Sequence, residues 1–224
     1  MTRQIAILRP QPGNDATADR VRAAGLEPLA LPLFALTPIA WHAPDPAGFD
    51  ALLLTSANAV RHGGAQLAHL RALPVLAVGE ATAAAARAMG FTVRRTGARD
   101  IAALLVQEPR TSRLLWLAAR DRTTIDHPAI AATIPVYSSD PVIPTRAQLR
   151  RLAGTVALIH SARAGRALAH ALDEGGIARA ALRIAAISAR AAAAAGPGWG
   201  AVAIAERPED GALIAAARGL AIDP

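Results

Sequence analysis

The stretch FDALLLTSANAVRHGGAQL, residues 49–67, decides the fold. It opens on a continuous apolar run, which predicts a strand buried on both faces, and the Thr-Ser pair that follows leads into a helical pattern. The stretch GTVALIHSARAGRALAHAL, residues 154–172, repeats this order with Ser161 opposite Ser56. A strand, a serine and a helix thus recur at roughly half the length of the 224-residue chain, which predicts an internal duplication.

A second pair of stretches supports the duplication. LPVLAVGEATAAAARAMGFTV (73–93) resembles LRIAAISARAAAAAGPGWGAV (182–202), with Gly79 opposite Ser188. Short apolar runs alternate with alanine-rich helical patterns along the whole chain, which predicts two similar α/β domains with parallel sheets. We expect strands at residues 5–8, 51–55, 75–78, 92–95, 114–118, 156–160, 184–187 and 202–205. We expect helices at residues 15–24, 57–72, 82–89, 101–107, 129–133, 162–172, 189–195 and 209–218.

Two proline-bounded extended segments, PLALPLFALTPIA (28–40) and IPVYSSDPVIP (134–144), interrupt this alternation. They are predicted to be linker strands between the domains, so the chain would cross out and back. The first domain would then comprise residues 1–33 and 140–224, and the second residues 38–133. The cleft bridged by the linkers is the expected ligand site.

Composition limits the possible functions. The chain has no cysteine, so disulfides and thiolate chemistry are excluded, and its histidines show no metal-binding spacing. Its 24 cations are all arginine, but no basic run is interleaved with aromatic residues, so we expect no nucleic-acid partner. The first residues enter a strand pattern with no signal-peptide pattern, and no apolar run is long enough to span a membrane. We expect a cytoplasmic monomer without a metal.

The candidate binding residues follow the expected strands. Ligands on parallel sheets collect beyond the carboxyl ends of the strands, where helix N-termini favour anions. The residues in these positions are Arg9, Ser56, Asn58, Gly79, Thr82, Ser161, Arg163 and Ser188. Each hydroxyl could instead be only a helix N-cap, and Arg163 a solvated helix residue. A nucleotide-binding enzyme is disfavoured, because no strand is followed by a glycine-rich turn into a helix.

Several motifs resemble the uroporphyrinogen-III synthase family: FDALLLTSANAV, AVGEATAAAARAMGF, the PVY of the second linker, VALIHSARAG, AAISARAAAA and the opening AILRP. The resemblance covers essentially the whole chain. It implies two α/β domains joined by a two-stranded linker, in agreement with the duplication. It also implies a cofactor-free lyase of tetrapyrrole (porphyrin and haem) biosynthesis. Such an enzyme cyclises hydroxymethylbilane, a small polycarboxylate linear tetrapyrrole, to uroporphyrinogen III with inversion of the last pyrrole ring and loss of water.

The resemblance also assigns site residues. Ser56, Thr82, Tyr137 and Ser161 match positions of the family, and Tyr137 is the expected catalytic residue. The segment SARA (188–191) departs from the family, which often has a threonine where this chain has Ala191. This departure leaves open an alternative function, a catalytically silent two-domain ligand-sensing protein with the same fold.

Tyr137 is the only tyrosine of the chain. A phenol with a pKa near 10 is protonated at neutral pH and can donate a hydrogen bond to the departing oxygen of the bilane. The alternative is a packing role for its ring, beside Phe34 of the other linker.

Overall fold

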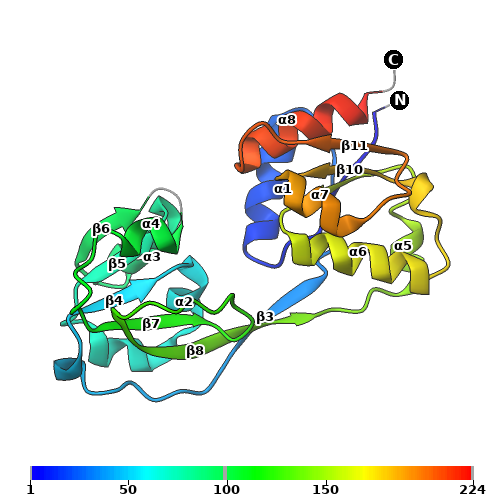
Figure 1. The fold of residues 1–224 in the computed structure, drawn as a ribbon. Helices are drawn as coiled ribbons and strands as arrows, with labels where there is room; N and C mark the ends of the chain where they lie inside the picture. The colour runs from blue at the N-terminus through cyan, green and yellow to red at the C-terminus, as the bar shows by residue number, and fades with distance from the viewer. Residues whose placement is uncertain (1, 98–99, 223–224) are drawn as a thin grey trace. The chain divides into compact units, whose positions relative to one another are not determined.

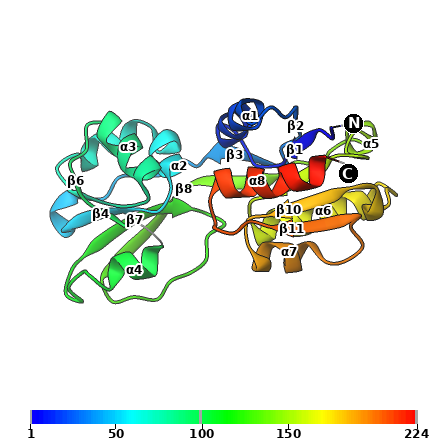
Figure 2. The same cartoon turned by 90° about the horizontal axis from the view of Figure 1, so that it is seen from above.

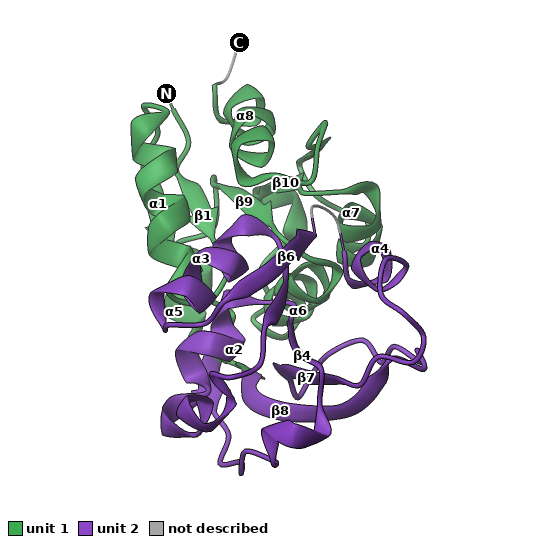
Figure 3. Cartoon of the chain, turned by 90° about the vertical axis from the view of Figure 1, so that its left-hand side faces the viewer, with its two compact units in different colours: residues 1–35, 140–224 green, residues 36–139 purple. Residues whose placement is uncertain are grey.

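The computed structural model describes residues 2–97 and 100–222, and the chain divides into two compact units, drawn in different colours in Figure 3. Unit 1 consists of Met1–Ala35 and Asp140–Pro224, and unit 2 of Leu36–Ser139. The chain therefore leaves unit 1 once and returns to it once. The prediction of two α/β domains with parallel sheets is confirmed.

Unit 1 is built on a five-stranded sheet in the order β11-β10-β9-β1-β2, with every adjacent pair parallel. Its strands are β1 (Ile5–Ile7), β2 (Pro28–Ala30), β9 (Val156–Ile159), β10 (Arg183–Ala186) and β11 (Ala201–Ile204). Its helices are α1 (Gly13–Ala23), α5 (Arg146–Arg150), α6 (Ala162–Glu174), α7 (Ala189–Ala195) and α8 (Asp210–Ala221), with a 3-10 turn at Arg179–Ala181.

Helices cover both faces of this sheet, which explains its continuously apolar strands (Figures 1 and 2). Ile5 and Ile7 pack with residues of α1 and α8 on one face. Ala6 and Ile159 pack with residues of α6 and α7 on the other. Successive strand residues thus alternate between two buried layers.

Unit 2 is built on a six-stranded sheet in the order β3-β8-β7-β4-β5-β6. Its strands are β3 (Phe34–Pro38), β4 (Ala51–Leu54), β5 (Val75–Val78), β6 (Val93–Gly97), β7 (Leu114–Ala119) and β8 (Ile130–Pro141). The first two residues of β3 and the last two of β8 belong to unit 1. Its helices are α2 (Ala57–His62), α3 (Glu80–Ala88) and α4 (Ile101–Leu105), with 3-10 turns at Pro46–Gly48 and Gly64–Leu70. The pairs β8–β7, β7–β4, β4–β5 and β5–β6 are parallel.

The two faces of this sheet are covered unequally. Residues of α2 and α3 pack on the face that carries Leu52 and Leu54. The face that carries Leu53 and Trp116 is covered by α4, a single short helix, and by Ala129.

The first expected linker segment, residues 28–40, contains β2 and β3. The second, residues 134–144, contains the end of β8. The N–H of Val142 donates to the carbonyl of Leu33 at 2.9 Å, and the N–H of Ile39 donates to that of Val136 at 3.0 Å. Between these two bonds the residue number rises from 33 to 39 on one segment and falls from 142 to 136 on the other. Strands β3 and β8 are therefore antiparallel.

Three local expectations were wrong. The predicted helix 57–72 is interrupted after His62, because Gly64 has a positive φ of 64°, and a 3-10 turn continues it. Residues 130–133 of the predicted helix 129–133 are the start of β8, where pairing with β7 overrides the helical pattern of the alanines. Helix α5 was missed, although Thr145 and Gln148 form a capping box at its start.

No helix among residues 2–97 and 100–222 is long and apolar enough to cross a membrane.

Candidate functional site

The strand orders place one topological switch point in each unit. In unit 1 the chain runs from β1 to β2 on one side and from β9 to β10 on the other. In unit 2 it runs from β4 to β5 on one side and from β7 to β8 on the other. Ligands of open α/β sheets bind beyond the carboxyl ends of the strands at such points. The relevant residues are therefore those around the ends of β1 and β9, and of β4 and β7.

Two predicted serines of unit 1 are helix N-caps. The hydroxyl of Ser161, two residues after β9, accepts a hydrogen bond from the N–H of Ala164 at 3.1 Å and caps α6. The Ser188 hydroxyl does the same for the N–H of Ala191 at 3.3 Å at the start of α7. At the start of α7 the N–H of Ala191 also donates to the carbonyl of Ser188 at 3.0 Å. Each cap thus offers an acceptor to a first-turn N–H group of its helix.

Arg9 follows β1 but has partners inside unit 1. Its guanidinium donates to the hydroxyl of Thr17 at 3.3 Å and lies 3.7 Å from a carboxylate oxygen of Asp210. Burial lowers the pKa of Arg9; the carboxylate of Asp210 opposes this effect and the charge of Arg20 adds to it. Arg9 is half-buried, so it keeps one exposed side at the end of β1 while the other is anchored.

Asp210, the first residue of α8, is the centre of a polar cluster that sequence reasoning missed. It accepts hydrogen bonds from Thr17 and from Arg20, the latter at 2.7 Å, and one of its oxygens lies 2.8 Å from Nε2 of His160. Burial alone would raise the pKa of Asp210, but hydrogen bonding and charge from His160, with the hydrogen bonds from Thr17 and Arg20, hold it well below its usual range. The cluster joins the end of β9 to α1 and α8.

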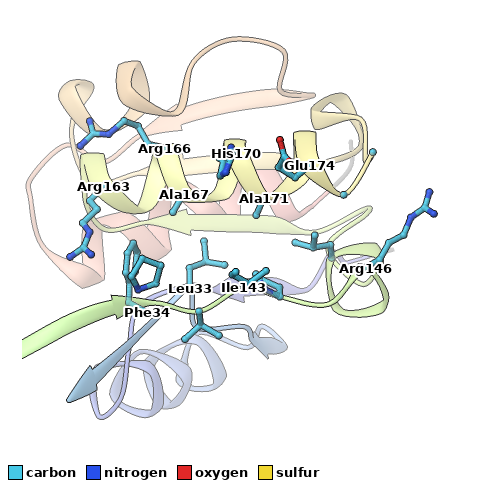
Figure 4. A pocket seen from close by; sticks show the side chains of 16 residues that line it. Leu33, Phe34, Ile143, Arg146, Arg163, Arg166, Ala167, His170, Ala171 and Glu174 are labelled. Atoms are coloured by element: carbon cyan, nitrogen blue, oxygen red, sulfur yellow. The ribbon is translucent and has the colours of Figure 1, made fainter.

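Arg163 lies in the first turn of α6, with its guanidinium carbon 4.4 Å from the centroid of the Phe34 ring. This cation–π contact holds the guanidinium of Arg163 over the ring of Phe34. Figure 4 shows both side chains at one end of a pocket in unit 1.

In unit 2, Ser56 and Asn58 lie at the start of α2. The Ser56 hydroxyl accepts from the N–H of Asn58 at 3.2 Å, and the Asn58 side chain accepts from Arg61. The expected cap at Ser56 is therefore present, as it is at Ser161.

Gly79 and Thr82 lie at the start of α3. Gly79 follows β5 with a φ of 80°, a conformation that favours glycine, and precedes the first residue of the helix. Thr82 is not a cap: it is the third residue of α3, and only 4% of it is exposed.

The departure from the family at Ala191 falls on a buried position. Thr82 and Ala191 are both third residues of their helices, and Ala191 is 1% exposed. A hydroxyl at position 191 would therefore belong to a buried helix start, so its loss alters packing there more than an exposed surface.

Tyr137 lies in β8 and is 7% exposed. Its ring packs in the unit 2 core and against His62 of α2, with 5.8 Å between ring centroids. Burial, and then the charge of Arg61, lower the pKa of His62. The packing partner of Tyr137 among these residues is thus His62, whereas the ring of Phe34 packs with Arg163.

The structure brings some candidates together within each unit. Arg9 and Ser161 follow neighbouring strands of unit 1, and Ser188 follows the next strand, β10. In unit 2, Tyr137 contacts the helix that Ser56 caps. No group of three or more His, Cys, Asp or Glu side chains in the described ranges is arranged to hold a metal ion.

These features define a class: a two-unit α/β protein with matching strand orders in its two sheets, and with helix N-termini and serine caps beyond the carboxyl ends of its parallel strands. Comparison with known proteins specifies it further. The family model described as uroporphyrinogen-III synthase HemD matches residues 15–215. The chain therefore belongs to the uroporphyrinogen-III synthase family.

Solved structures were compared for the fold. The uroporphyrinogen-III synthetase of Helicobacter pylori is 18% identical and has a TM-score of 0.67, with 97% of this chain and 99% of that chain covered, so the two share a fold. The uroporphyrinogen III synthase of Thermus thermophilus is 17% identical and has a TM-score of 0.45, with 96% and 97% covered. No curated protein matches this chain.

Proposed function

We propose that this chain is a hydro-lyase that converts hydroxymethylbilane to uroporphyrinogen III and water. The family match over residues 15–215 carries this proposal. In the reaction, the bond between the terminal hydroxymethyl carbon and its oxygen breaks, and the oxygen leaves as water after gaining a proton. The carbon then bonds to the α-carbon of the last pyrrole ring that already carries the methylene bridge. The bond from this bridge to the ring breaks and forms again at the other α-carbon, which loses one proton, so the ring is inverted.

The strand-end residues suit the substrate, which carries acetate and propionate side chains on its pyrrole rings. In unit 1, Arg9, Arg163 and the N-terminal turn of α6 offer donors to carboxylates. In unit 2, the N-terminal turns of α2 and α3 do so at Ser56, Asn58, Gly79 and Thr82. Ser188 adds the start of α7. Their role is to hold the flexible chain in the conformation that leads to the inverted ring.

Tyr137 is the proposed donor to the departing oxygen. Its phenol is protonated at neutral pH and so needs no further activation to donate a hydrogen bond. Packing against His62 limits the ring to few orientations, which suits a positioned donor. The chemistry is proposed to need no cofactor, since the substrate contains both the electrophilic carbon and the nucleophilic ring.

The proposal extends to the setting of the enzyme. We propose a cytoplasmic monomer that acts in porphyrin and haem biosynthesis and has no nucleic-acid partner. Sedimentation at micromolar concentration tests the monomer.

Product analysis tests the reaction itself. Hydroxymethylbilane closes spontaneously to the uninverted isomer, uroporphyrinogen I. The purified chain should yield uroporphyrinogen III at a rate proportional to protein concentration. Formation of isomer I alone, at the spontaneous rate, would overturn the proposal and favour the ligand-sensing alternative.

A further inference from the structure

The backbone around Arg9, at the end of β1, is fixed by the first turn of α1. Asn14, which is fully buried, donates from Nδ2 to the carbonyl of Ile7 at 2.9 Å and to that of Arg9 at 3.0 Å. The backbone N–H of Asn14 donates to the carbonyl of Pro10 at 3.0 Å. The side chain of Arg9 therefore starts from a backbone position that is held on both sides.

The guanidinium of Arg9 lies against the backbone of Gly13, the first residue of α1. A Cβ at this position would be 2.5 Å from Nε of Arg9 and 2.8 Å from its Cζ, much closer than the roughly 3.5–4.0 Å of an ordinary contact. Gly13 is helical and its φ is not positive, so other residues can adopt its conformation. Glycine is therefore needed here for space and not for backbone freedom.

Thr17, one turn further along α1, binds the same guanidinium through its hydroxyl. Thr17 is fully buried, and its hydroxyl lies 3.0 Å from Oδ2 of Asp210. The pKa of Asp210 lies well below its usual range, so the carboxylate is ionised and accepts the hydroxyl proton of Thr17. The oxygen of Thr17 then accepts from Nη1 of Arg9, at 3.3 Å. Asp210 thus fixes the direction in which Thr17 acts on Arg9.

This arrangement holds Arg9 without neutralising it by a direct ion pair. Nη1 of Arg9 is 3.7 Å from an oxygen of Asp210, whereas Arg20 donates to Asp210 at 2.7 Å. Among the described residues, Thr17 is the one hydrogen-bond acceptor of the Arg9 guanidinium, and none of its nitrogen atoms is buried without a partner. The remaining N–H groups therefore face solvent beyond the end of β1, where they can bind a carboxylate in a bidentate geometry.

We propose that Gly13 and Thr17 are positioning residues, which hold the Arg9 guanidinium in the orientation that binds a carboxylate of the substrate. The inference rests on the proposed function, in which Arg9 binds the substrate, and extends it to two residues that act through Arg9. Gly13 supplies the space for the guanidinium, and Thr17 supplies an acceptor whose direction Asp210 sets. A substitution of either residue should therefore affect binding only while Arg9 is present.

Gly13→Ala fills the space beside the guanidinium and leaves the helix intact. Its control is Gly219→Ala in α8, where an added Cβ would meet nothing within 4 Å. We expect KM for hydroxymethylbilane to rise about tenfold in Gly13→Ala, with kcat within about twofold of the wild type, and no change in Gly219→Ala. The urea midpoint of Gly13→Ala should not fall, because alanine favours the helix and only the end of a flexible side chain has to move.

Thr17→Val keeps the shape of the side chain and removes the hydroxyl, and Thr17→Ser keeps the hydroxyl. We expect KM to rise about fivefold in Thr17→Val and to stay within about twofold of the wild type in Thr17→Ser. This pair also serves if Gly13→Ala does not fold. Arg9→Ala should raise KM at least about tenfold, and adding Gly13→Ala or Thr17→Val to it should cause no further rise.

NMR of the Arg9 side chain tests its position without the reaction. The Nε–H signal is assigned by its loss in Arg9→Lys, and its ¹H–¹⁵N NOE reports motion on the fast timescale. We expect a high NOE in the wild type, Thr17→Ser and Gly219→Ala, and a low one in Gly13→Ala and Thr17→Val. Citrate, a tricarboxylate probe, should shift the signal saturably in the wild type and bind at least about fivefold more weakly in Gly13→Ala and Thr17→Val.

Wild-type KM in both Gly13→Ala and Thr17→Val would overturn the proposal, and so would a further rise in KM when either is combined with Arg9→Ala. An Arg9 signal that is as mobile in the wild type as in these variants, or that citrate does not shift, would overturn it as well. A wild type with the expected NMR behaviour that forms no uroporphyrinogen III would contradict the proposed function alone.

Discussion

The two units contain the same strand–serine–helix element but pack its helix differently. In unit 1, Gly165 of α6 lies so close to α7 that an added Cβ would be 3.0 Å from the carbonyl oxygen of Ala191 and 3.1 Å from the backbone nitrogen of Ala195. In unit 2, the equivalent residue of α2 is Val60, which is buried in the core. The two units thus share the order of five strands, and in unit 1 the absence of a side chain at Gly165 permits the close approach of α6 to α7.

The connection from β1 to β2 also differs from its counterpart in unit 2, which leads from β7 to β8. In unit 1, β1 connects to β2 through α1. In unit 2, β7 connects to the parallel strand β8 through residues 120–129. The structure describes every residue of this connection, and they form no helix. There Arg122 lies over the Trp116 ring at 5.5 Å, and the Trp116 indole N–H donates to Thr55. In unit 2 the side chains of Trp116 and Arg122 thus lie on a sheet face whose counterpart in unit 1 is covered by α1.

The largest effect is expected from a substitution that breaks the close contact between α6 and α7 in unit 1. Gly165→Val should lower the free energy of unfolding by about 3 kcal/mol, because its new atoms meet backbone that cannot move aside. Val60→Ala in unit 2 only removes buried methyl groups and should lower it by about 1–2 kcal/mol. Urea denaturation measures both. A loss in Gly165→Val no larger than that in Val60→Ala would show that the helix separation is not fixed by glycine.

Tyr137→Phe tests the role proposed for Tyr137, which has no counterpart proposed in unit 1. We expect turnover of hydroxymethylbilane to fall about 10²-fold, since the proposed hydrogen bond to the departing oxygen would be lost, with nearly unchanged stability and product affinity because the ring remains. Steady-state kinetics measures the turnover, and thermal unfolding is the control. Turnover within about twofold of the wild type would make Tyr137 a packing partner of His62 only.

Asp210→Asn tests the polar cluster of unit 1. The depressed pKa of Asp210 means that its carboxylate stabilises the fold above the usual carboxyl pKa of about 4, and that this stabilisation is lost as the pH falls below it. At pH 7 the variant should therefore be about 2 kcal/mol less stable than the wild type, and the difference should shrink below about pH 4. Urea denaturation across this pH range measures the difference.

The control for the cluster is Asp19→Asn, since Asp19 is exposed and forms an ion pair with Arg22 within α1. It should change stability by less than about 0.5 kcal/mol. A difference between the wild type and Asp210→Asn that does not depend on pH would contradict the ionised cluster.

The smallest expected effects compare the two matched caps. Ser161→Ala and Ser56→Ala should each lower the free energy of unfolding by about 1 kcal/mol, and replacement by Asp should restore it. Ser161 caps a helix of 13 residues and Ser56 one of 6 residues, so we expect the larger loss at Ser161. Loss of substrate affinity without loss of stability would mean that the hydroxyls act on the ligand and not on the helix.

Residues whose partners are close in sequence were the predictable ones. Ser56, Ser161 and Ser188 were expected at helix starts because each lies between an apolar strand and a helical pattern, and all three cap there. The contact between His160 and Asp210, 50 residues apart, could not be expected, because it depends on α8 packing beside the end of β9.

The prediction of a helix at residues 129–133 was wrong for a related reason. Alanines gave a helical signal, but pairing of β8 with β7 decides the conformation there, and that pairing is not encoded within the segment. The pocket of unit 1 in Figure 4 likewise depends on Ala171 of α6 facing Ile143 from another part of the chain.

The most direct test of the enzymatic function is the isomer ratio formed from hydroxymethylbilane, measured by chromatography of the oxidised products at several protein concentrations. The proposed activity predicts that the fraction of isomer III rises with wild-type protein towards complete conversion. It also predicts that Tyr137→Phe needs about a hundredfold more protein for the same fraction. Isomer I alone at every protein concentration would contradict the assignment of this chain as an active uroporphyrinogen-III synthase.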